Sequence, residues 1–412
     1  MFIQSKLSRQ NFNTIIYILG DLLNKALPFI LLPILLSFIS LDDFGRLSLL
    51  TSTIDLLFIF ILLGGNAYFK VRFFSDNVNA NSLRKKLFNQ SLIVTVLMIF
   101  LTIGYSLLND LVFNEIFILI LLPVCSFLKS IVTIYISGFQ CQEQPFSVAK
   151  IEVSSTLIVF ISTLFLLYIG LGYESRIFGI ALAYALVAVF ISSRDGFLTF
   201  KKAKKDNFSK DAIKFGIGIL PNALSWWCRG NLDKFLILYF LTVNEVGEYT
   251  IYLQMSLFVI ILGNAINNAY QPQIFKLLER SESEIAKKLI LKMSVVTVIL
   301  CSTITLIFPY IITSIISPEH FSNVNIFYLL CLGNMVRCAM VYNSNYYYYY
   351  SFTKQLSSIS LVGLASHVLL GIVGLYFCGL YGLAISTLIT YIFIFILQYI
   401  YSSKTIFGSN NG

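Results

Sequence analysis

The chain has 412 residues, of which 57% are hydrophobic and only 12% are charged. Charged residues make up roughly 25% of an ordinary soluble domain, so this composition excludes a soluble globular protein and indicates one that is solvated by a lipid bilayer. The formal net charge of +9 would suit nucleic acid, but the bases lie in short clusters between apolar runs, as is typical of membrane topology.

Twelve membrane-spanning helices are predicted in chain order, because an apolar run of about 18 residues is long enough to cross a bilayer. We expect them at residues 13–39, 44–69, 88–108, 115–139, 151–170, 177–193, 213–241, 246–270, 289–316, 324–348, 357–377 and 379–402. The first run lacks a small-residue cleavage site, so we interpret it as a span and not as a signal peptide. The predicted fold class is an all-α polytopic membrane protein.

Positive charge in the loops predicts how these spans are oriented. If the N-terminus is cytoplasmic, 22 of the 29 Lys and Arg residues fall in cytoplasmic segments, and only Arg46 and Arg176 fall on the opposite side. Cytoplasmic loops of membrane proteins carry such an excess of Lys and Arg. Because twelve is an even number, both termini are expected in the cytoplasm (N-in, C-in).

An internal repeat relates the two halves of the chain. A shift of 202 residues brings Asn66-Ala67-Tyr68 onto Asn268-Ala269-Tyr270, and it brings the loop acid Asp43 onto Glu245. Self-similarity at a fixed shift indicates two copies of one structural unit. We therefore predict two halves of the same fold.

The repeat sets the expected domain organisation. We predict an N-terminal six-helix lobe at 1–200, a basic cytoplasmic linker at 201–212 and a C-terminal six-helix lobe at 213–412. Each half has an even number of spans, so the two lobes are expected to be parallel repeats. Repeats of this kind are a transporter architecture in which the substrate binds between the halves.

Eight charged residues lie inside the predicted spans. The bases are Lys25, Lys129, Arg229, Lys234 and Arg337, and the acids are Asp21, Asp55 and Asp233. A central Lys, Arg or Asp costs roughly 2.5–3.5 kcal/mol on insertion scales, so these side chains must pair with opposite charges or face a water-filled cavity. The excess of bases over acids suits an anionic substrate, and phosphate is a natural candidate.

Two of these pairs have helical spacing. Asp21 with Lys25, and Arg229 with Asp233, are separated by four residues, so each pair can meet along its own helix. Such a pair either neutralises itself for structural reasons or contributes to substrate contact.

For three further residues the sequence leaves two possible roles open. Asp55 either pairs with a base or carries a coupling proton. Lys234 either faces the interior or extends its amine to the membrane surface. His367, in the middle of a predicted span, is either a hydrogen-bonded structural residue or a proton relay.

The sequence contains no pattern that predicts catalysis or metal binding. There is no G-x-x-x-x-G-K-[ST] phosphate loop, no nucleophile–His–acid constellation and no CxxC pair or Cys/His cluster. A membrane polymerase or glycosyltransferase is expected to present catalytic residues on a sizeable outer loop, whereas the segments expected outside are short. We therefore expect no enzymatic activity, no catalytic residues, no cofactor and no metal site.

Two parts of the sequence resemble a known family. One is Leu220-Pro221-Asn222-Ala223-Leu224-Ser225-Trp226-Trp227 with Leu232-Asp233-Lys234-Phe235 and Glu245-Val246-Gly247-Glu248-Tyr249; the other is Lys25-Ala26-Leu27-Pro28 with Asp42-Asp43-Phe44-Gly45. They are similar to helices 7–8 and to the opening of the O-antigen (O-unit) flippases. These are polysaccharide exporters of the multidrug/oligosaccharidyl-lipid/polysaccharide (MOP) exporter superfamily. At Lys234 and Glu248 the chain departs from the family's more common Arg and Leu.

The resemblance implies a MATE-like MOP exporter fold and a function. The chain is expected to move oligosaccharide units linked to undecaprenyl pyrophosphate from the cytoplasmic to the periplasmic leaflet of a bacterial inner membrane. Alternating access between two lobes, driven by an ion gradient, is the implied mechanism. The expected substrate-binding cations are Lys25, Lys129, Arg229 and Arg337, with Asp21, Asp55, Asp233 and Lys234 as charge partners or coupling groups.

The implied partners are the lipid-linked oligosaccharide, membrane lipids, and the polymerase and chain-length regulator of the same pathway, with no nucleic acid. Two alternatives stay open. A MATE-like drug/cation antiporter would favour an interior with surplus acid, whereas this sequence has surplus base. A membrane-embedded polysaccharide polymerase or glycosyltransferase is the alternative from a different class.

Overall fold

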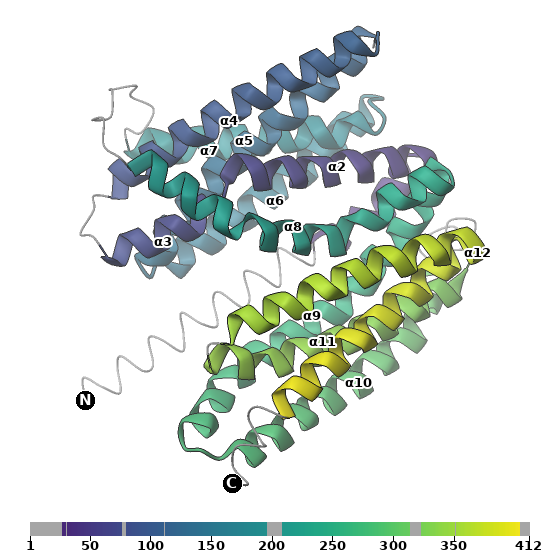
Figure 1. The fold of residues 1–412 in the computed structure, drawn as a ribbon. Helices are drawn as coiled ribbons and strands as arrows, with labels where there is room; N and C mark the ends of the chain where they lie inside the picture. The colour runs from purple at the N-terminus through teal and green to yellow at the C-terminus, as the bar shows by residue number, and fades with distance from the viewer. Residues whose placement is uncertain are drawn as a thin grey trace. The chain divides into compact units, whose positions relative to one another are not determined.

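A computed structural model describes residues 27–29, 31–75, 80–110, 112–195, 208–313, 323–350 and 352–403. Within these ranges the chain is almost entirely α-helical and contains no β-strand. The helices, shown in Figure 1, are α2 (Leu41–Leu62), α3 (Gly65–Ser75), α4 (Ala80–Leu108), α5 (Phe113–Cys141), α6 (Pro145–Tyr168), α7 (Glu174–Asp195), α8 (Phe208–Phe240), α9 (Val243–Glu279), α10 (Ser283–Thr313), α11 (Val324–Tyr349) and α12 (Thr353–Ser402).

The described helices other than α8 have the length and composition of membrane spans, with α3 continuing α2. Nine helical stretches in the described part of the chain are long and apolar enough to cross a bilayer, with α2 and α3 counted together. The prediction of a multi-pass all-α membrane protein is confirmed. The first predicted span lies largely outside the described residues, and the total of twelve spans and the N-in, C-in orientation stay predictions.

The helix α12 is a hairpin of two antiparallel helices. Its backbone leaves the helical region at Gly379 (φ 55°, ψ −141°), a left-handed conformation that glycine adopts without steric penalty. The two arms contact each other: Ser386 Oγ donates a hydrogen bond to the Leu370 carbonyl at 2.6 Å, and Gly363 lies against Ile394 further from the turn. Two spans were predicted here, at 357–377 and 379–402, and the turn falls between them.

The chain forms two compact units, described separately here. One comprises residues 1–39 and 46–227, and the other comprises residues 40–45 and 228–412. The division falls inside α8, whose first part belongs to the first unit and whose last part belongs to the second. The lobe boundaries proposed from the sequence stay predictions.

In the first unit α5 is the central helix. It packs against α3, α4, α6 and α7. One buried cluster joins α5 to α2 and α7 through Ile54, Leu122 and Ile177. A second cluster joins α5 to α7 through Tyr135 and Val187. The helix that carries Lys129 is therefore held on several sides by apolar contacts.

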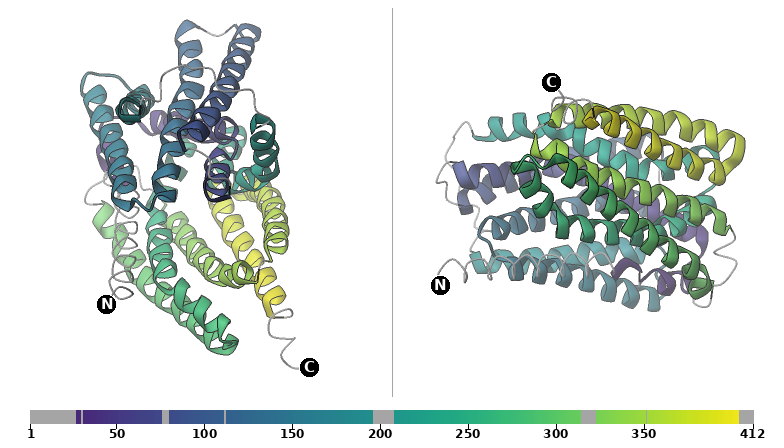
Figure 2. Two further views of the ribbon diagram at one scale, coloured as in Figure 1. Left: turned by 90° about the vertical axis from the view of Figure 1, so that its left-hand side faces the viewer. Right: turned by 90° about the horizontal axis from the view of Figure 1, so that it is seen from below.

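In the second unit α9, α10, α11 and α12 run side by side (Figures 1 and 2), and α11 packs against the other three. Polar side chains join α11 to α9 along its length. Asn334 Nδ2 donates to Ser256 Oγ at 2.9 Å, and Asn345 Nδ2 donates to Asn267 Oδ1 at 2.9 Å. Such interhelical hydrogen bonds fix the register of apolar helices that lipid would otherwise solvate equally well.

The first turns of α2 and α9 meet by a reciprocal contact within the second unit. A methyl group at Gly45 would overlap the carbonyl oxygen of Val243, and one at Gly247 would overlap the carbonyl oxygen of Leu41. The shift of 202 residues pairs Leu41 with Val243 and Gly45 with Gly247. Repeat-equivalent residues therefore contact each other in the manner of a two-fold interface.

The same two helices begin with the same cap. Ser40 Oγ accepts a hydrogen bond from the Asp43 N–H at 3.1 Å, and Thr242 Oγ1 accepts one from the Glu245 N–H at 3.3 Å. A hydroxyl at the N-cap satisfies an N–H of the first helical turn, and a nearby acid favours the positive end of the helix dipole. The acids that the sequence repeat aligns thus have a structural role at helix starts.

Candidate functional site

Lys129 of α5 and Asp55 of α2 form an ion pair in the first unit. Lys129 Nζ lies 2.6 Å from Asp55 Oδ1 and 4.8 Å from the ring centroid of Phe58. One turn away, Ser126 Oγ donates to the Ile54 carbonyl at 2.8 Å and holds the two helices together. The side chains are still 29% and 47% exposed, so the pair is neutralised but accessible.

The second unit contains a buried acid–base pair that the sequence analysis did not assemble. His367 Nε2 of α12 lies 2.7 Å from Asp233 Oδ1 of α8, and the side chains are 2% and 5% exposed. Tyr249 of α9 donates its hydroxyl to Asp233 Oδ2 at 3.5 Å. The helical spacing predicted Arg229 as the neighbour of Asp233. The structure brings in His367 from 134 residues away.

Two arginines lie in the same region of the second unit. Arg229, one turn before Asp233 on α8, is 9% exposed. Its guanidinium is close enough to Arg337 of α11 for the two charges to repel each other, and it also interacts electrostatically with Tyr391 of α12. Two neighbouring cations are the donor type that suits an anion with several negative charges, and a role for them in binding stays a prediction.

The remaining predicted site residues are not brought into these clusters. Lys234 Nζ donates to Asn231 Oδ1 at 3.3 Å on the same helix. Lys25 and Asp21 lie outside the described residues. The part of the chain that the structure describes contains no group of three His, Cys, Asp or Glu side chains placed to hold a metal ion.

One base counted as a cytoplasmic loop residue is a buried helical residue. Arg84 belongs to α4, is 3% exposed and lies with its guanidinium carbon 4.7 Å from the ring centroid of Tyr135. The helix α4 begins at Ala80, eight residues before the expected start at 88, so Arg84 lies in its first turns, and the side of the membrane on which it lies stays a prediction.

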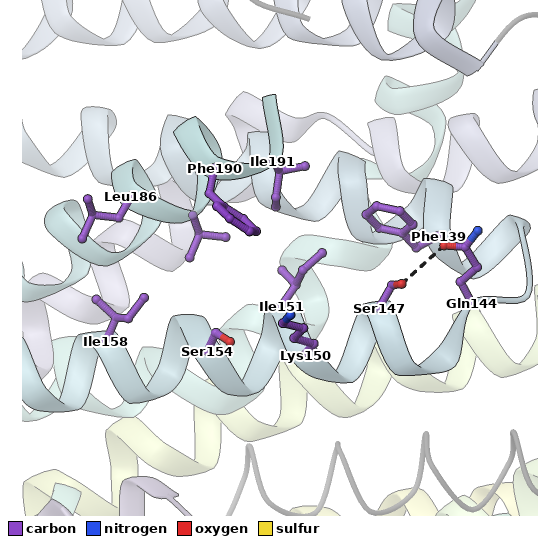
Figure 3. A pocket seen from close by; sticks show the side chains of 11 residues that line it. Phe139, Gln144, Ser147, Lys150, Ile151, Ser154, Ile158, Leu186, Phe190 and Ile191 are labelled. Atoms are coloured by element: carbon purple, nitrogen blue, oxygen red, sulfur yellow. Dashed lines mark hydrogen bonds between the residues drawn. The ribbon is translucent and has the colours of Figure 1, made fainter. Parts of the chain in front are cut away.

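An apolar groove of about 610 Å³ lies between the end of α5, α6 and α7 in the first unit. Figure 3 shows side chains of α7, including Phe190, pointing towards those of α6. The polar lining residues gather in the first half of α6 and just before it, and the lining deeper along α6 is apolar. These polar residues are Gln144, Ser147, Lys150 and Ser154. None of the predicted site residues lines this groove.

The architecture is that of a multi-pass membrane protein with the MATE fold. A solved inward-facing multidrug resistance MATE family transporter of the MOP superfamily is similar, with a TM-score of 0.67 over 94% of this chain and 96% of that one, at 13% identity. The Vibrio cholerae MATE transporter VcmN is similar with a TM-score of 0.61 over 99% of both chains, at 13% identity. These similarities show the fold.

The chain belongs to the polysaccharide biosynthesis protein family, whose model matches residues 12–278. A protein of the Lsg locus of Haemophilus influenzae is 24% identical over 375 residues, which cover 86% of this chain and 89% of that protein. The resemblance to the polysaccharide exporters of the MOP superfamily, drawn from two segments of sequence, is therefore confirmed.

Proposed function

We propose that this protein is a flippase for lipid-linked oligosaccharides. It moves O-antigen-type repeat units on undecaprenyl pyrophosphate from the cytoplasmic to the periplasmic leaflet of a bacterial inner membrane by alternating access, coupled to an ion gradient. Membership of the polysaccharide biosynthesis family and the MATE fold support an exporter. The identity of the substrate, the direction of its transport and the membrane in which it occurs are the parts that we propose.

The neighbouring guanidinium groups of Arg229 and Arg337 carry this proposal. Two like charges close together among apolar helices repel each other, and a bound dianion removes that repulsion. Pyrophosphate presents several oxygens to such donors, and Arg suits phosphate recognition because its planar guanidinium binds two oxygens at once. Lys129 is neutralised by Asp55, so it offers an anion less positive charge than Arg229 and Arg337 together.

Removing one arginine tests the proposal in cells. We expect Arg337→Gln to abolish surface polysaccharide at unchanged protein level and to strand lipid-linked repeat units in the inner leaflet. Arg337→Lys keeps the charge but loses two-point contact, so it should retain partial function. The matched control is Lys354→Gln, which removes an exposed base at the start of α12. Normal surface polysaccharide in Arg337→Gln would contradict the assignment.

The drug/cation antiporter remains the second candidate, because the solved structures with this fold include multidrug transporters. An antiporter for cations requires an acid that is free to bind them, and Asp55 is a partly exposed acid inside a span of the first unit. Its pairing with Lys129 disfavours that use. Resistance to cationic drugs, lost in Asp55→Asn but kept in Arg337→Gln, would favour the antiporter over the flippase.

A further inference from the structure

Asp233 and His367 form a deeply buried ionisable pair, with side chains 5% and 2% exposed. It joins α8 to α12 in the second unit by a contact of 2.7 Å between Oδ1 and Nε2. Ionisable side chains inside membrane spans are costly to keep and usually mark an ion or proton pathway. An imidazole beside a carboxylate can exchange a proton near neutral pH.

The charged and titratable groups around this pair come from four helices of the second unit. Arg229 on α8 and Tyr249 on α9 interact with the pair itself. Tyr391 on the second arm of α12 interacts with Arg229 and Tyr249, and Arg337 on α11 interacts with Arg229. Tyr249 hydrogen-bonds to the free oxygen of Asp233, and Arg229 interacts electrostatically with His367. The acid–base pair and the two arginines therefore form one electrostatic cluster.

We propose that Asp233 and His367 bind one proton, and that this proton strengthens the binding of a phosphate-type dianion at Arg229 and Arg337. The proposal rests on the proposed transport function and deepens it by naming a proton site that is linked to substrate binding. Without the proton, neutral imidazole and carboxylate together carry one negative charge. Uptake of one proton from water gives imidazolium and carboxylate with no net charge, and no other bond changes.

The chemistry of the site favours a proton over sodium. A hard cation requires a shell of oxygen ligands, which broken transmembrane helices supply through unwound carbonyls. Here the two carboxylate oxygens of Asp233 already have hydrogen-bonding partners, which are the ring nitrogen of His367 and the hydroxyl of Tyr249. The helix α8 is continuous through Asp233, and the non-helical residue inside α12 is Gly379, more than three turns beyond His367.

Charge couples the two ligands in both directions. A proton on the pair adds one positive charge beside the arginines, so it raises their affinity for an anion. A bound anion in turn favours the protonated pair, and the two effects are equal by thermodynamic linkage. With one linked proton, the affinity for the anion changes by up to about tenfold per pH unit while the pair titrates.

Anion binding to the purified full-length protein tests this coupling. Sulfate is a suitable probe because it stays a dianion between about pH 5 and 8, the range in which histidine titrates. Calorimetry in buffers of different ionisation enthalpy reports both the affinity and the protons taken up. For the wild type we expect tighter binding as the pH falls, by up to about tenfold per unit, and uptake of up to one proton per sulfate.

The variants assign this linkage to the pair. His367→Gln and Asp233→Asn should bind sulfate without proton uptake and with an affinity that no longer depends on pH. His320→Gln removes the chain's other histidine and should behave like the wild type. Wild-type binding without proton uptake, no sulfate binding at any pH, or wild-type pH dependence in His367→Gln or Asp233→Asn would overturn the proposal.

This experiment does not depend on the transported molecule. Suppose that the wild type shows the linkage in vitro but Arg337→Gln leaves surface polysaccharide and lipid-linked units unchanged in cells. The flippase assignment then fails and the proton site stands. If surface polysaccharide depends on Arg337 but sulfate binding shows no linked proton, the flippase assignment stands and the proton site fails.

Discussion

Lys129 and Asp55 meet at 2.6 Å although 74 residues separate them in sequence. Each residue alone would be costly in an apolar span, and together they neutralise each other. Their partial exposure leaves the amine able to contact a second anion. If the pair is purely structural, replacing both residues by apolar ones should leave transport intact. If the pair binds substrate, the same double replacement should abolish transport.

We expect Lys129→Met alone to destabilise the protein by about 1–3 kcal/mol, because it leaves the Asp55 carboxylate uncompensated at a partly exposed site. The double variant Lys129→Met/Asp55→Leu should recover this stability, as measured by unfolding in detergent. It should still fail to restore surface polysaccharide, because the cation is gone. Normal polysaccharide from the stable double variant would show that the pair is only structural.

At the residue scale, the sequence singled out charged side chains inside the spans, but it did not predict which of them contact each other. Their position inside apolar runs singled out Asp55, Lys129, Asp233 and Arg337, because a charged side chain is costly in a membrane span. Helical spacing then favoured Arg229 as the neighbour of Asp233. Spacing reports contacts within one helix, whereas the contact with His367 depends on how α12 folds back in the second unit.

The groove between α6 and α7 suits the apolar part of an amphipathic lipid. Its lining is apolar except for residues in the first half of α6 and just before it, where Lys150 lies among hydroxyl and amide groups. A prenyl chain along the apolar part would place a phosphate near that amine.

Filling this groove should slow transport without unfolding the protein. Ser154→Trp places a bulky ring among the lining side chains, and we expect the flipping rate to fall by about tenfold, which corresponds to about 1.4 kcal/mol. Leu157→Trp is the matched control, because Leu157 is 39% exposed on the same helix and does not line the groove. Equal rates for the two variants would contradict a role for the groove.

Helix existence was predictable from apolar runs, and helix ends were less so. The run predicted at 246–270 became α9, which continues to Glu279. The run predicted at 88–108 became α4, which starts at Ala80. Hydropathy predicts the part of a helix that lies in the lipid. The polar turns beyond it are stabilised by packing and capping, which a pattern of apolar residues does not predict.

At the scale of the whole molecule, the repeat carried the most structural information. The shift of 202 residues aligned Asp43 with Glu245 and Gly45 with Gly247. The structure gives both acids a place in the first turn of a helix and makes the two glycines reciprocal contacts. The groove was not predictable, since its lining residues come from three elements and share no sequence pattern.

The flippase assignment is tested most directly by following a lipid-linked oligosaccharide between leaflets in proteoliposomes that contain the purified protein. We predict that an imposed proton gradient accelerates movement of undecaprenyl-pyrophosphate-linked repeat units to the opposite leaflet, and that Arg337→Gln abolishes this movement. Movement at the same slow rate with the wild type, with Arg337→Gln and with protein-free vesicles would contradict the account.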